Sequence, residues 1–363
     1  MQSKLQNTGE DAYFAASNSR DGFRSYYEHC FRGRVDRLFC IKGGPGTGKS
    51  TLMRAVAREG ERYGYRADYY YCSSDPTSLD AVLLYGEHDS VGLIDATAPH
   101  VFEPQLPGIA EEVIDLGQFW DAARLETHRG DVERWNAQKA RAYRVAYRHL
   151  AGVGEVSDNL RDIIAPCVDE KRLGRLALRL LRGTREGQGT RRVALCDSVG
   201  LSGCVRLDTY LRRSERLCLI EDYHDSAYLL TERLSAEAVS RGLDVRVSYH
   251  PVLPDRIDAL MLTADRTAFV VCSHGEVEHL SHAFPHARIV SMKRMTVSER
   301  VRAVREQLRR TTHLRDALLE EACLQLDCAA RAHFELENIY TAAMDFAAKE
   351  QFTQALCRRL FGE

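Results

Sequence analysis

The sequence lacks several features that would assign the protein to a specialised class. No apolar run approaches the length that spans a bilayer, and the opening residues MQSKLQNTGEDAY contain no apolar stretch of the kind that a signal peptide needs. The eleven cysteines are odd in number and never spaced as CxxC, so nothing indicates a disulfide framework. We therefore expect reduced cysteines, no membrane segment and a cytoplasmic location.

The chain is also poor in lysine and nearly neutral. Only seven of its 50 basic residues are lysine, and the formal net charge is −2. Proteins with a general attraction for nucleic acid are more basic than this, so we expect no nucleic-acid partner. At 363 residues the chain is long enough for about two domains.

One stretch carries a clear chemical pattern. Residues 37–51 read RLFCIKGGPGTGKST, in which the apolar run at 38–41 predicts a buried strand. Residues 43–50 match the phosphate-loop (Walker A) pattern at every fixed position, and an amphipathic segment follows. Strand, loop and helix in this order are the context that the pattern requires.

The residue types of this loop suit a triphosphate bound with Mg²⁺. Glycines let backbone N–H groups approach the phosphates, and the dipole of the following helix adds positive potential. We expect Lys49 to reach the β- and γ-phosphates and the Ser50 hydroxyl to ligate Mg²⁺. The predicted nucleotide-binding residues are Gly43, Gly44, Pro45, Gly46, Thr47, Gly48, Lys49, Ser50 and Thr51.

The apolar pattern predicts further elements on both sides of the loop. Residues 1–36 are expected to be partly helical. After the loop we predict strands at 66–72 and 91–94, a short helix at 78–85, a strand or helix within 111–120, and helices over 121–181.

The second half of the sequence resembles the first. The matching segments are 37–41 with 216–220 (RLFCI and RLCLI), 76–82 with 254–260, and the third strand with 267–271. We predict an internal repeat of about 180 residues, with domains at 1–190 and 191–363. Asp80 and its counterpart Asp258 occur in both halves and are expected to serve the fold.

The phosphate loop itself is not repeated. At the corresponding place the second half reads DYHDSAY (222–228), without glycine and with Tyr228 in the position of Lys49. Asp222 and Asp225 would repel phosphate. We therefore expect a degenerate second half and one nucleotide for each chain.

The strings KGGPGTGKSTLM, CSSDPTSLDAV and DATAPHVFEPQLPGIAEEVIDLGQFWD, together with the repeat, resemble an uncharacterised bacterial family of P-loop ATPase-like proteins. The resemblance covers nearly the whole chain and is specific in the first half. It implies nucleotide binding and two tandem P-loop halves, usually both with an intact loop. The expected fold class is α/β, with tandem duplicated P-loop NTPase-like domains, parallel sheets flanked by helices, and helical appendages.

Two aspartates outside the loop are further candidates. Asp95 ends an apolar strand, where it would hold Mg²⁺ through water, or where it would serve only as a cap or turn residue. Asp75 follows another strand and is a candidate base, metal ligand or Asx-turn residue. The catalytic candidates are thus Lys49, Asp95 and Asp75, with Ser50 and Asp95 as metal ligands. His100 is expected to be structural.

Two other groups of residues are expected to have no specific function. The histidine-rich cluster of the second half matches no closed zinc pattern; it comprises Cys272, His274, His279, His282 and His286. The arginine-rich segment 171–192 resembles a contact for nucleic acid or an anionic membrane. The nearly neutral chain favours a solvated helix face instead.

We therefore predict Mg²⁺-dependent binding and hydrolysis of ATP (or GTP) by the first half. The enzymatic alternative is a small-molecule or nucleotide kinase, since such enzymes also carry this loop. A regulatory switch, in which nucleotide biases a conformation without useful turnover, is the alternative from another class. Beyond the nucleotide, an unidentified small molecule or protein remains an expected partner.

Overall fold

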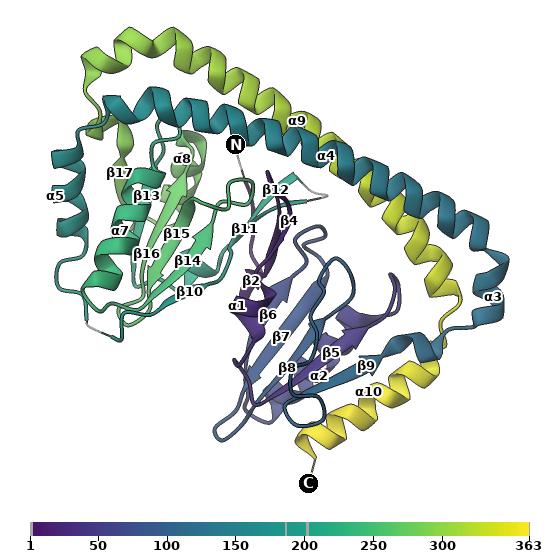
Figure 1. Ribbon diagram of the computed structural model, residues 1–363. Helices are drawn as coiled ribbons and strands as arrows, with labels where there is room; N and C mark the ends of the chain where they lie inside the picture. The colour runs from purple at the N-terminus through teal and green to yellow at the C-terminus, as the bar shows by residue number, and fades with distance from the viewer. Residues whose placement is uncertain (1–2, 186, 201–202, 363) are drawn as a thin grey trace.

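The computed structural model describes residues 3–185, 187–200 and 203–362 and contains two six-stranded sheets (Figure 1). In spatial order the first sheet consists of β2 (Asp11–Phe14), β6 (Arg66–Tyr71), β7 (Leu79–Tyr85), β8 (Ser90–Asp95), β5 (Arg37–Lys42) and β9 (Glu111–Asp115). The second consists of β10 (Arg191–Val193), β14 (Val245–Tyr249), β15 (Ile257–Leu262), β16 (Thr267–Cys272), β13 (Arg216–Glu221) and β17 (Arg288–Ser291). The two sheets therefore have the same strand order.

The helix predicted at 78–85 is wrong, because this segment forms strand β7. β7 is antiparallel to both of its neighbours, and so is β15 in the second sheet. The sheets are consequently mixed, which corrects the prediction of parallel sheets. Residues 72–78 form a connection too short for the crossover that parallel neighbours need. The run LDAVLLY is almost continuously buried, and a short apolar run fits a buried strand as well as a helix.

Both sheets carry the same irregularity at the same place. The pairing register shifts between Tyr70 and Tyr71 in the first sheet and between Ser248 and Tyr249 in the second. Beyond the shift, Ala81 pairs with Ile94 as Ala259 pairs with Val270. Asp80 and Asp258 therefore occupy equivalent positions in the two sheets.

The segment before the loop is partly helical, as expected for 1–36, although most of its regular structure is extended. It contains β1 (Lys4–Gln6), β2, the hairpin of β3 (Ala16–Ser19) and β4 (Gly22–Ser25), and the short helix α1 (Tyr27–Phe31). β1 joins a small sheet with β12 (Gly203–Leu207), which pairs with β11 (Asp197–Gly200). The start of the chain is therefore bound to the second half.

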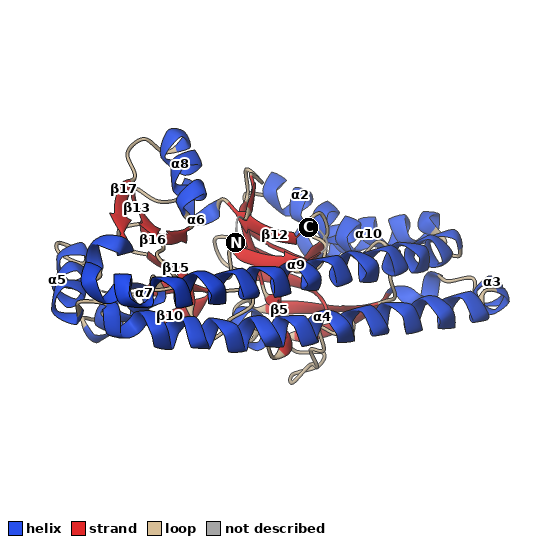
Figure 2. Cartoon of the chain, turned by 90° about the horizontal axis from the view of Figure 1, so that it is seen from above, coloured by secondary structure: helices blue, strands red, loops and turns tan. Residues whose placement is uncertain are grey.

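Two long helices connect the halves. α4 (Arg129–Ile164) leaves the first half, and α9 (Ser298–Ala342) returns from the second, packed antiparallel along α4 (Figure 2). The remaining short helices are α3 (Ala122–Thr127), α6 (Thr209–Arg212), α8 (His274–Ala283), η1 (Leu116–Phe119), η2 (Ala165–Cys167) and η3 (Met292–Met295). No helix within the described residues is both long and apolar enough to cross a bilayer.

The helices that follow the long pair are exchanged between the halves. α5 (Glu170–Leu180), which follows α4, packs on α7 (Tyr228–Ser240) of the second half, whereas α10 (Phe346–Phe361) packs on α2 (Lys49–Arg62) of the first. Backbone hydrogen bonds tie both junctions, from Asp345 N to Phe119 O (2.9 Å) and from Asp169 N to Met295 O (2.8 Å). Each half is thus packed against a helix that follows the long helix from the other half.

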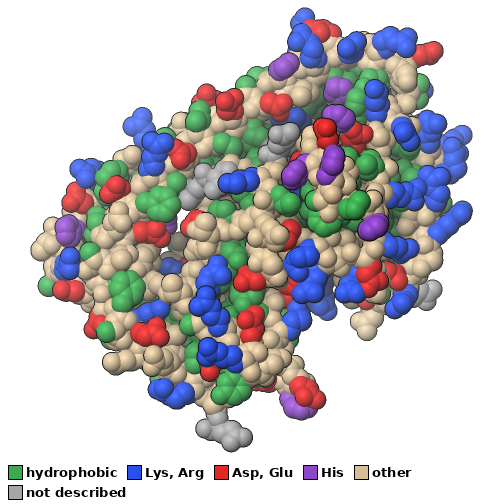
Figure 3. Space-filling view, turned by 180° about the vertical axis from the view of Figure 1, so that it is seen from behind, with side chains coloured by type: hydrophobic (Ala, Val, Ile, Leu, Met, Phe, Trp, Pro, Cys, Tyr) green, Lys and Arg blue, Asp and Glu red, His purple; other side chains and the backbone are tan. Residues whose placement is uncertain are grey.

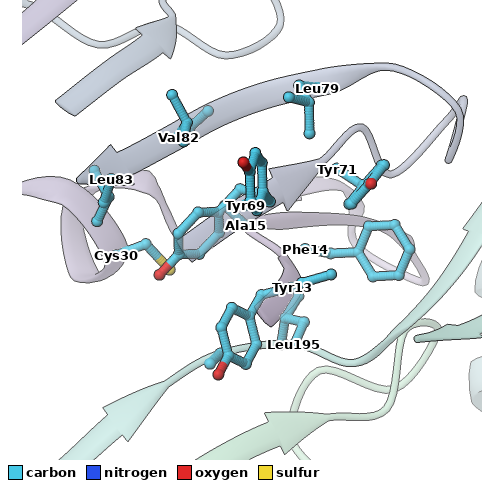
Figure 4. Close-up of a cluster of buried hydrophobic side chains, with 14 of the residues drawn as sticks. Tyr13, Phe14, Ala15, Cys30, Tyr69, Tyr71, Leu79, Val82, Leu83 and Leu195 are labelled. Carbon is cyan, nitrogen blue, oxygen red and sulfur yellow. The ribbon is translucent and has the colours of Figure 1, made fainter. Parts of the chain in front are cut away.

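The main core also crosses between the halves. Strand β2 lies against Leu195 of the second half: Figure 4 shows Tyr13 beside Leu195, and the Phe14 N–H donates to the Leu195 carbonyl at 2.8 Å. Tyr69 and Leu79 of the first sheet belong to the same buried cluster as Leu195. The division into domains at 1–190 and 191–363 therefore stays a prediction, since strands and helices of each segment pack against the other.

Candidate nucleotide-binding site

The glycine-rich loop lies between a buried strand and a helix, as the sequence predicts. β5 ends at Lys42, and α2 begins at Lys49. Gly46 and Gly48 have φ angles of 69° and 77°, in the left-handed region that glycine tolerates best. A Cβ atom on Gly46 would lie 2.7 Å from the backbone oxygen of Glu337. The loop therefore needs glycine for its own conformation and for the close approach of α9.

Lys49 is held over the loop beside one of the predicted carboxylates. Its Nζ atom donates to the carbonyl oxygens of Gly43 (2.9 Å) and Gly44 (2.8 Å). The same atom lies 3.4 Å from Asp95 Oδ2, and both side chains are only 13% exposed. The structure thus brings Lys49 and Asp95 together from the start of α2 and the end of β8.

The Asp95 carboxylate has a second partner in its own turn. Its Oδ1 atom accepts a hydrogen bond from Thr97 N at 2.8 Å, and the Thr97 hydroxyl donates to Gly43 O at 2.9 Å. Asp95 is therefore both the turn aspartate and the ion-pair partner of Lys49. These contacts tie the turn after β8 to the first residue of the loop.

Ser50 and Asp95 offer the oxygen atoms that a magnesium ion prefers. The Ser50 hydroxyl oxygen accepts a hydrogen bond from Leu79 N at 3.0 Å, which fixes its position against β7. Hydroxyl and carboxylate oxygens are the hard ligands that Mg²⁺ takes alongside water and phosphate oxygens. The donor set next to Lys49 therefore fits Mg²⁺.

Asp75 forms a turn of its own. Its carboxylate accepts hydrogen bonds from the backbone N–H (3.0 Å) and the hydroxyl (2.7 Å) of Thr77. Among the described residues, Asp95 is the carboxylate that pairs with Lys49. The contacts of Asp75 thus fit its Asx-turn interpretation, and a catalytic role for it stays a prediction.

A buried polar cluster that the sequence did not reveal lies next to Asp95. His100 Nε2 is 3.2 Å from Asp80 Oδ2, and the imidazole ring stacks on Tyr27 with ring centres 4.9 Å apart. Burial raises the pKa of Asp80 to about 6, with His100 opposing the rise and Asp95 adding to it. Within the described residues, Cys72, Asp80 and His100 are the set of three ligand-type side chains whose atoms lie within 4.8 Å of one another.

The end of α9 covers one side of the loop. The Thr341 hydroxyl donates to Gly46 O at 3.3 Å. Trp120 and Tyr340, whose ring centres are 5.4 Å apart, lie against Gly44. The loop is therefore in contact with the helix that returns from the second half, an arrangement that no local pattern in the sequence predicts.

The exchanged helix α10 adds a buried lysine beside the loop. Lys349 is 4% exposed, and its Nζ atom donates to the Thr51 hydroxyl at 2.9 Å. The same nitrogen lies 3.4 Å from the position of a Cβ on Gly48. Burial lowers the pKa of Lys349, because an ammonium is poorly solvated there. The only feature of the sequence that could have drawn attention to Lys349 is the scarcity of lysine in this chain.

The corresponding loop of the second half is closed by its own side chain. Asp222 accepts hydrogen bonds from Asp225 N (2.8 Å) and Ala227 N (2.9 Å), just before α7 begins at Tyr228. The carboxylate thus binds the backbone N–H groups that a phosphate would need at such a loop. Asp225 in turn pairs with the buried guanidinium of Arg256.

The residues of the histidine-rich cluster do not come together in one site. Cys272 is buried beside Arg206, whereas His274, His279 and His282 lie exposed along α8. His274 is instead paired with Glu221 at 2.6 Å. A cavity of about 110 Å³ lies nearby, lined by side chains of both charges that include Arg206, Arg256, Asp258 and Glu276.

Comparison with known proteins gives one partial match. The family model described as Nephrocystin 3, N-terminal, which is associated with proteins that contain P-loop NTPase domains, matches residues 23–83. This segment includes β5, the glycine-rich loop, α2, β6 and part of β7. The match does not extend to the second half, and it gives no direct support for a bacterial family with two P-loop halves. No curated protein and no solved structure matches the chain.

Proposed function

We propose that the first half binds a nucleoside triphosphate, ATP or GTP, with Mg²⁺ in a P-loop NTPase-like fold, and hydrolyses it. The observation that carries the proposal is the position of Lys49. This residue starts α2, spans the loop by bonds to two loop carbonyls and lies 3.4 Å from Asp95. A lysine at a helix N-terminus inside a glycine loop combines a cation, free N–H groups and a positive dipole end.

The residues around Lys49 divide the work of binding. The loop N–H groups and Lys49 would bind the phosphates, and Ser50 and Asp95 would hold Mg²⁺. The metal would supply charge neutralisation at the β- and γ-phosphates. Neither Asp95, which is paired with Lys49, nor Ala96 after it offers a free base for water. Slow hydrolysis is therefore expected from this chain alone.

Removal of Lys49 tests the binding site. Lys49→Ala is expected to weaken ATP binding by about ten- to a hundredfold, because one charge-assisted contact contributes roughly 1.5–3 kcal/mol. Lys42→Ala is the matched control: it removes a lysine seven residues earlier that is paired with Glu103 at 3.0 Å near the surface. Calorimetry should show near-wild-type affinity for the control. Equal affinity in folded Lys49→Ala and in wild type would contradict the assignment.

The contacts of α9 and α10 with the loop favour a second function, a nucleotide-dependent switch. Thr341 and Lys349 touch Gly46 and Thr51, so a bound phosphate would meet groups that belong to the helices from the second half. Hydrogen exchange of α10 with and without a non-hydrolysable ATP analogue tests this function. Increased protection of α10 together with negligible turnover would favour the switch over the enzyme.

A further inference from the structure

One end of the molecule is strongly basic, although the whole chain is not. We define the basic end as residues 169–185 and 288–310, which hold fourteen Lys and Arg residues and four Asp and Glu residues. Their net charge is +10 at pH 7, so the rest of the chain carries −12 of the total of −2. The nearly neutral total therefore conceals a large separation of charge.

The fold joins these two segments, which are more than a hundred residues apart in sequence. Arg172 Nη1 donates to the Arg294 carbonyl at 2.9 Å, and Arg300 Nη1 donates to the Pro166 carbonyl at 2.9 Å. α5, η3 and the start of α9 consequently form one continuous end of the second half. Figure 3 shows Lys and Arg side chains gathered along the edge that corresponds to the α5 and β17 end of Figure 1.

The basic side chains of this end are exposed and mostly free of carboxylates. All fourteen are exposed: Lys171, Arg172, Arg175, Arg179, Arg182, Arg185, Arg288, Lys293, Arg294, Arg300, Arg302, Arg305, Arg309 and Arg310. Within the described residues, three of them form ion pairs, Arg185 with Asp265 and the pair Arg309 and Arg310 with Glu306.

Some arginines on other exposed helices of the same chain are paired with carboxylates. Arg129 pairs with Glu126 at 2.7 Å, and Arg331 pairs with Asp327 at 2.6 Å. Other exposed arginines, among them Arg141 and Arg144 of α4, form no ion pair within the described residues. What distinguishes the basic end is the number of cations that it gathers with few carboxylates.

Charge is distributed unevenly along α9. Residues 298–310 carry five arginines and two glutamates, whereas residues 311–342 carry two arginines and six acidic residues. The basic end therefore includes the arginine-rich start of α9, whereas the acidic residues lie farther along the helix.

We propose that the basic end binds the phosphate backbone of double-stranded nucleic acid without reading its sequence. The fourteen cations suit a polyanion, and arginine binds phosphate oxygens with a planar fork of donors. The two segments contain no aromatic residue. Proteins that bind single strands stack bases on aromatic rings, so a duplex fits this surface better.

A membrane surface fits the basic end less well. An amphipathic helix that lies on a bilayer inserts its apolar face among the acyl chains. The apolar face of α5 is already used, because Leu173, Leu176 and Leu180 are buried in the core cluster with α7. Leu178 and Ile289 are the large apolar side chains of the basic end that are exposed.

Binding of fluorescent 20-bp DNA and RNA duplexes, measured by anisotropy with the full chain, tests the proposal. Affinity should fall steeply with salt, by about a thousandfold between 50 and 200 mM if six or more phosphates are contacted. The quadruple variant Arg175→Glu, Arg179→Glu, Arg302→Glu, Arg305→Glu should bind at least tenfold more weakly. The same four residues changed to lysine should retain most of the affinity, because the charge is kept.

A control variant with the same change in net charge separates local from general attraction. Arg129→Glu, Arg134→Glu, Arg141→Glu and Arg144→Glu alter exposed residues of α4 on the other part of the molecule. The control should bind within about threefold of wild type. An equal loss in both variants, or affinity below that for phosphatidylserine vesicles, would overturn the proposal. A larger loss for RNA than for DNA, or the reverse, would support it and identify the duplex.

Discussion

Asp95 uses its two carboxylate oxygens for different partners, Lys49 and the turn at Thr97. In Asp95→Asn the side-chain oxygen can still accept from Thr97, but the negative charge is lost. We therefore expect Mg²⁺-dependent hydrolysis to fall by roughly tenfold or more, while nucleotide binding without metal is largely retained. The measurements are a phosphate-release assay with Mg²⁺ and calorimetry in a chelator.

Asp75→Asn is the natural comparison for this variant. Asp75 also follows a strand, but its carboxylate bonds only within its own turn, to Thr77, among the described residues. Turnover should therefore be close to wild type in Asp75→Asn. Loss of turnover in this variant, with activity preserved in Asp95→Asn, would exchange the roles of the two residues.

Asp80 should make the stability of the fold depend on pH. Burial raises its pKa from an ordinary value of 3.8 to about 6, so the folded chain holds this proton more tightly than the unfolded chain. The free energy of unfolding should therefore fall as pH rises from 4 to 6, by about 2 kcal/mol from this group. Asp80→Asn keeps the shape of the side chain and removes the titration.

Urea unfolding of wild type and Asp80→Asn at several pH values between 4 and 7 measures this effect. Other buried carboxyls with a raised pKa, such as Asp68 and Asp225, remain in both proteins and cancel in the difference. The stability of the variant relative to wild type should increase with pH across this window. A difference that is constant with pH would contradict the assignment.

At the scale of the element, α10 is the helix that brings a charge to the loop. Lys349 is a buried ammonium whose one hydrogen-bond acceptor in the described part of the chain is the Thr51 hydroxyl. Removal of a buried charge often stabilises a protein. We expect Lys349→Met to be at least as stable as wild type and yet to bind ATP about tenfold more weakly. Thermal unfolding without nucleotide and calorimetry give the two readings.

Glu350→Gln is the matched control, because it changes an exposed charge on the next residue of α10. It should change neither the unfolding temperature nor the affinity for ATP by more than a small amount. A Lys349→Met variant that unfolds more easily and binds ATP normally would show that the ammonium serves only the packing of α10 on α2.

The sequence predicts the elements best where their signals are local. β5, the glycine loop and α2 follow from one stretch of fifteen residues, and the strands β6 and β8 follow from their apolar runs. The sequence does not distinguish strand β7 from a helix, because a run of seven mostly buried residues has no distinguishing period. The position of Lys349 beside the loop cannot be predicted from local sequence, since almost three hundred residues separate it from Thr51.

At the scale of the whole molecule, the exchange of α5 and α10 links the two halves through reciprocal contacts. The exchange depends on packing between segments far apart in the sequence, so neither the internal repeat nor local helix propensity predicts it. Figure 1 shows α10 lying against the first half after α9 has crossed the molecule. The helices that return from the second half therefore contact the loop directly, through Thr341 and Lys349. These contacts do not depend on a ligand in the second half.

The two loops differ in what their backbone N–H groups bind. In the second half, Asp222 already accepts bonds from Asp225 N and Ala227 N, and Tyr228 stands where the first half has Lys49. Displacement of that carboxylate by a phosphate would place two anions in one site, at a cost of several kcal/mol if they are desolvated. We therefore predict one nucleotide for each chain.

The most direct measurement is a calorimetric titration of the full chain with a non-hydrolysable ATP analogue and Mg²⁺. The account predicts a stoichiometry near one for wild type and a single site, weakened by about ten- to a hundredfold, in Lys49→Ala. Two sites in wild type, or one site that keeps wild-type affinity in Lys49→Ala, would show that nucleotide binds elsewhere and would contradict the central claim.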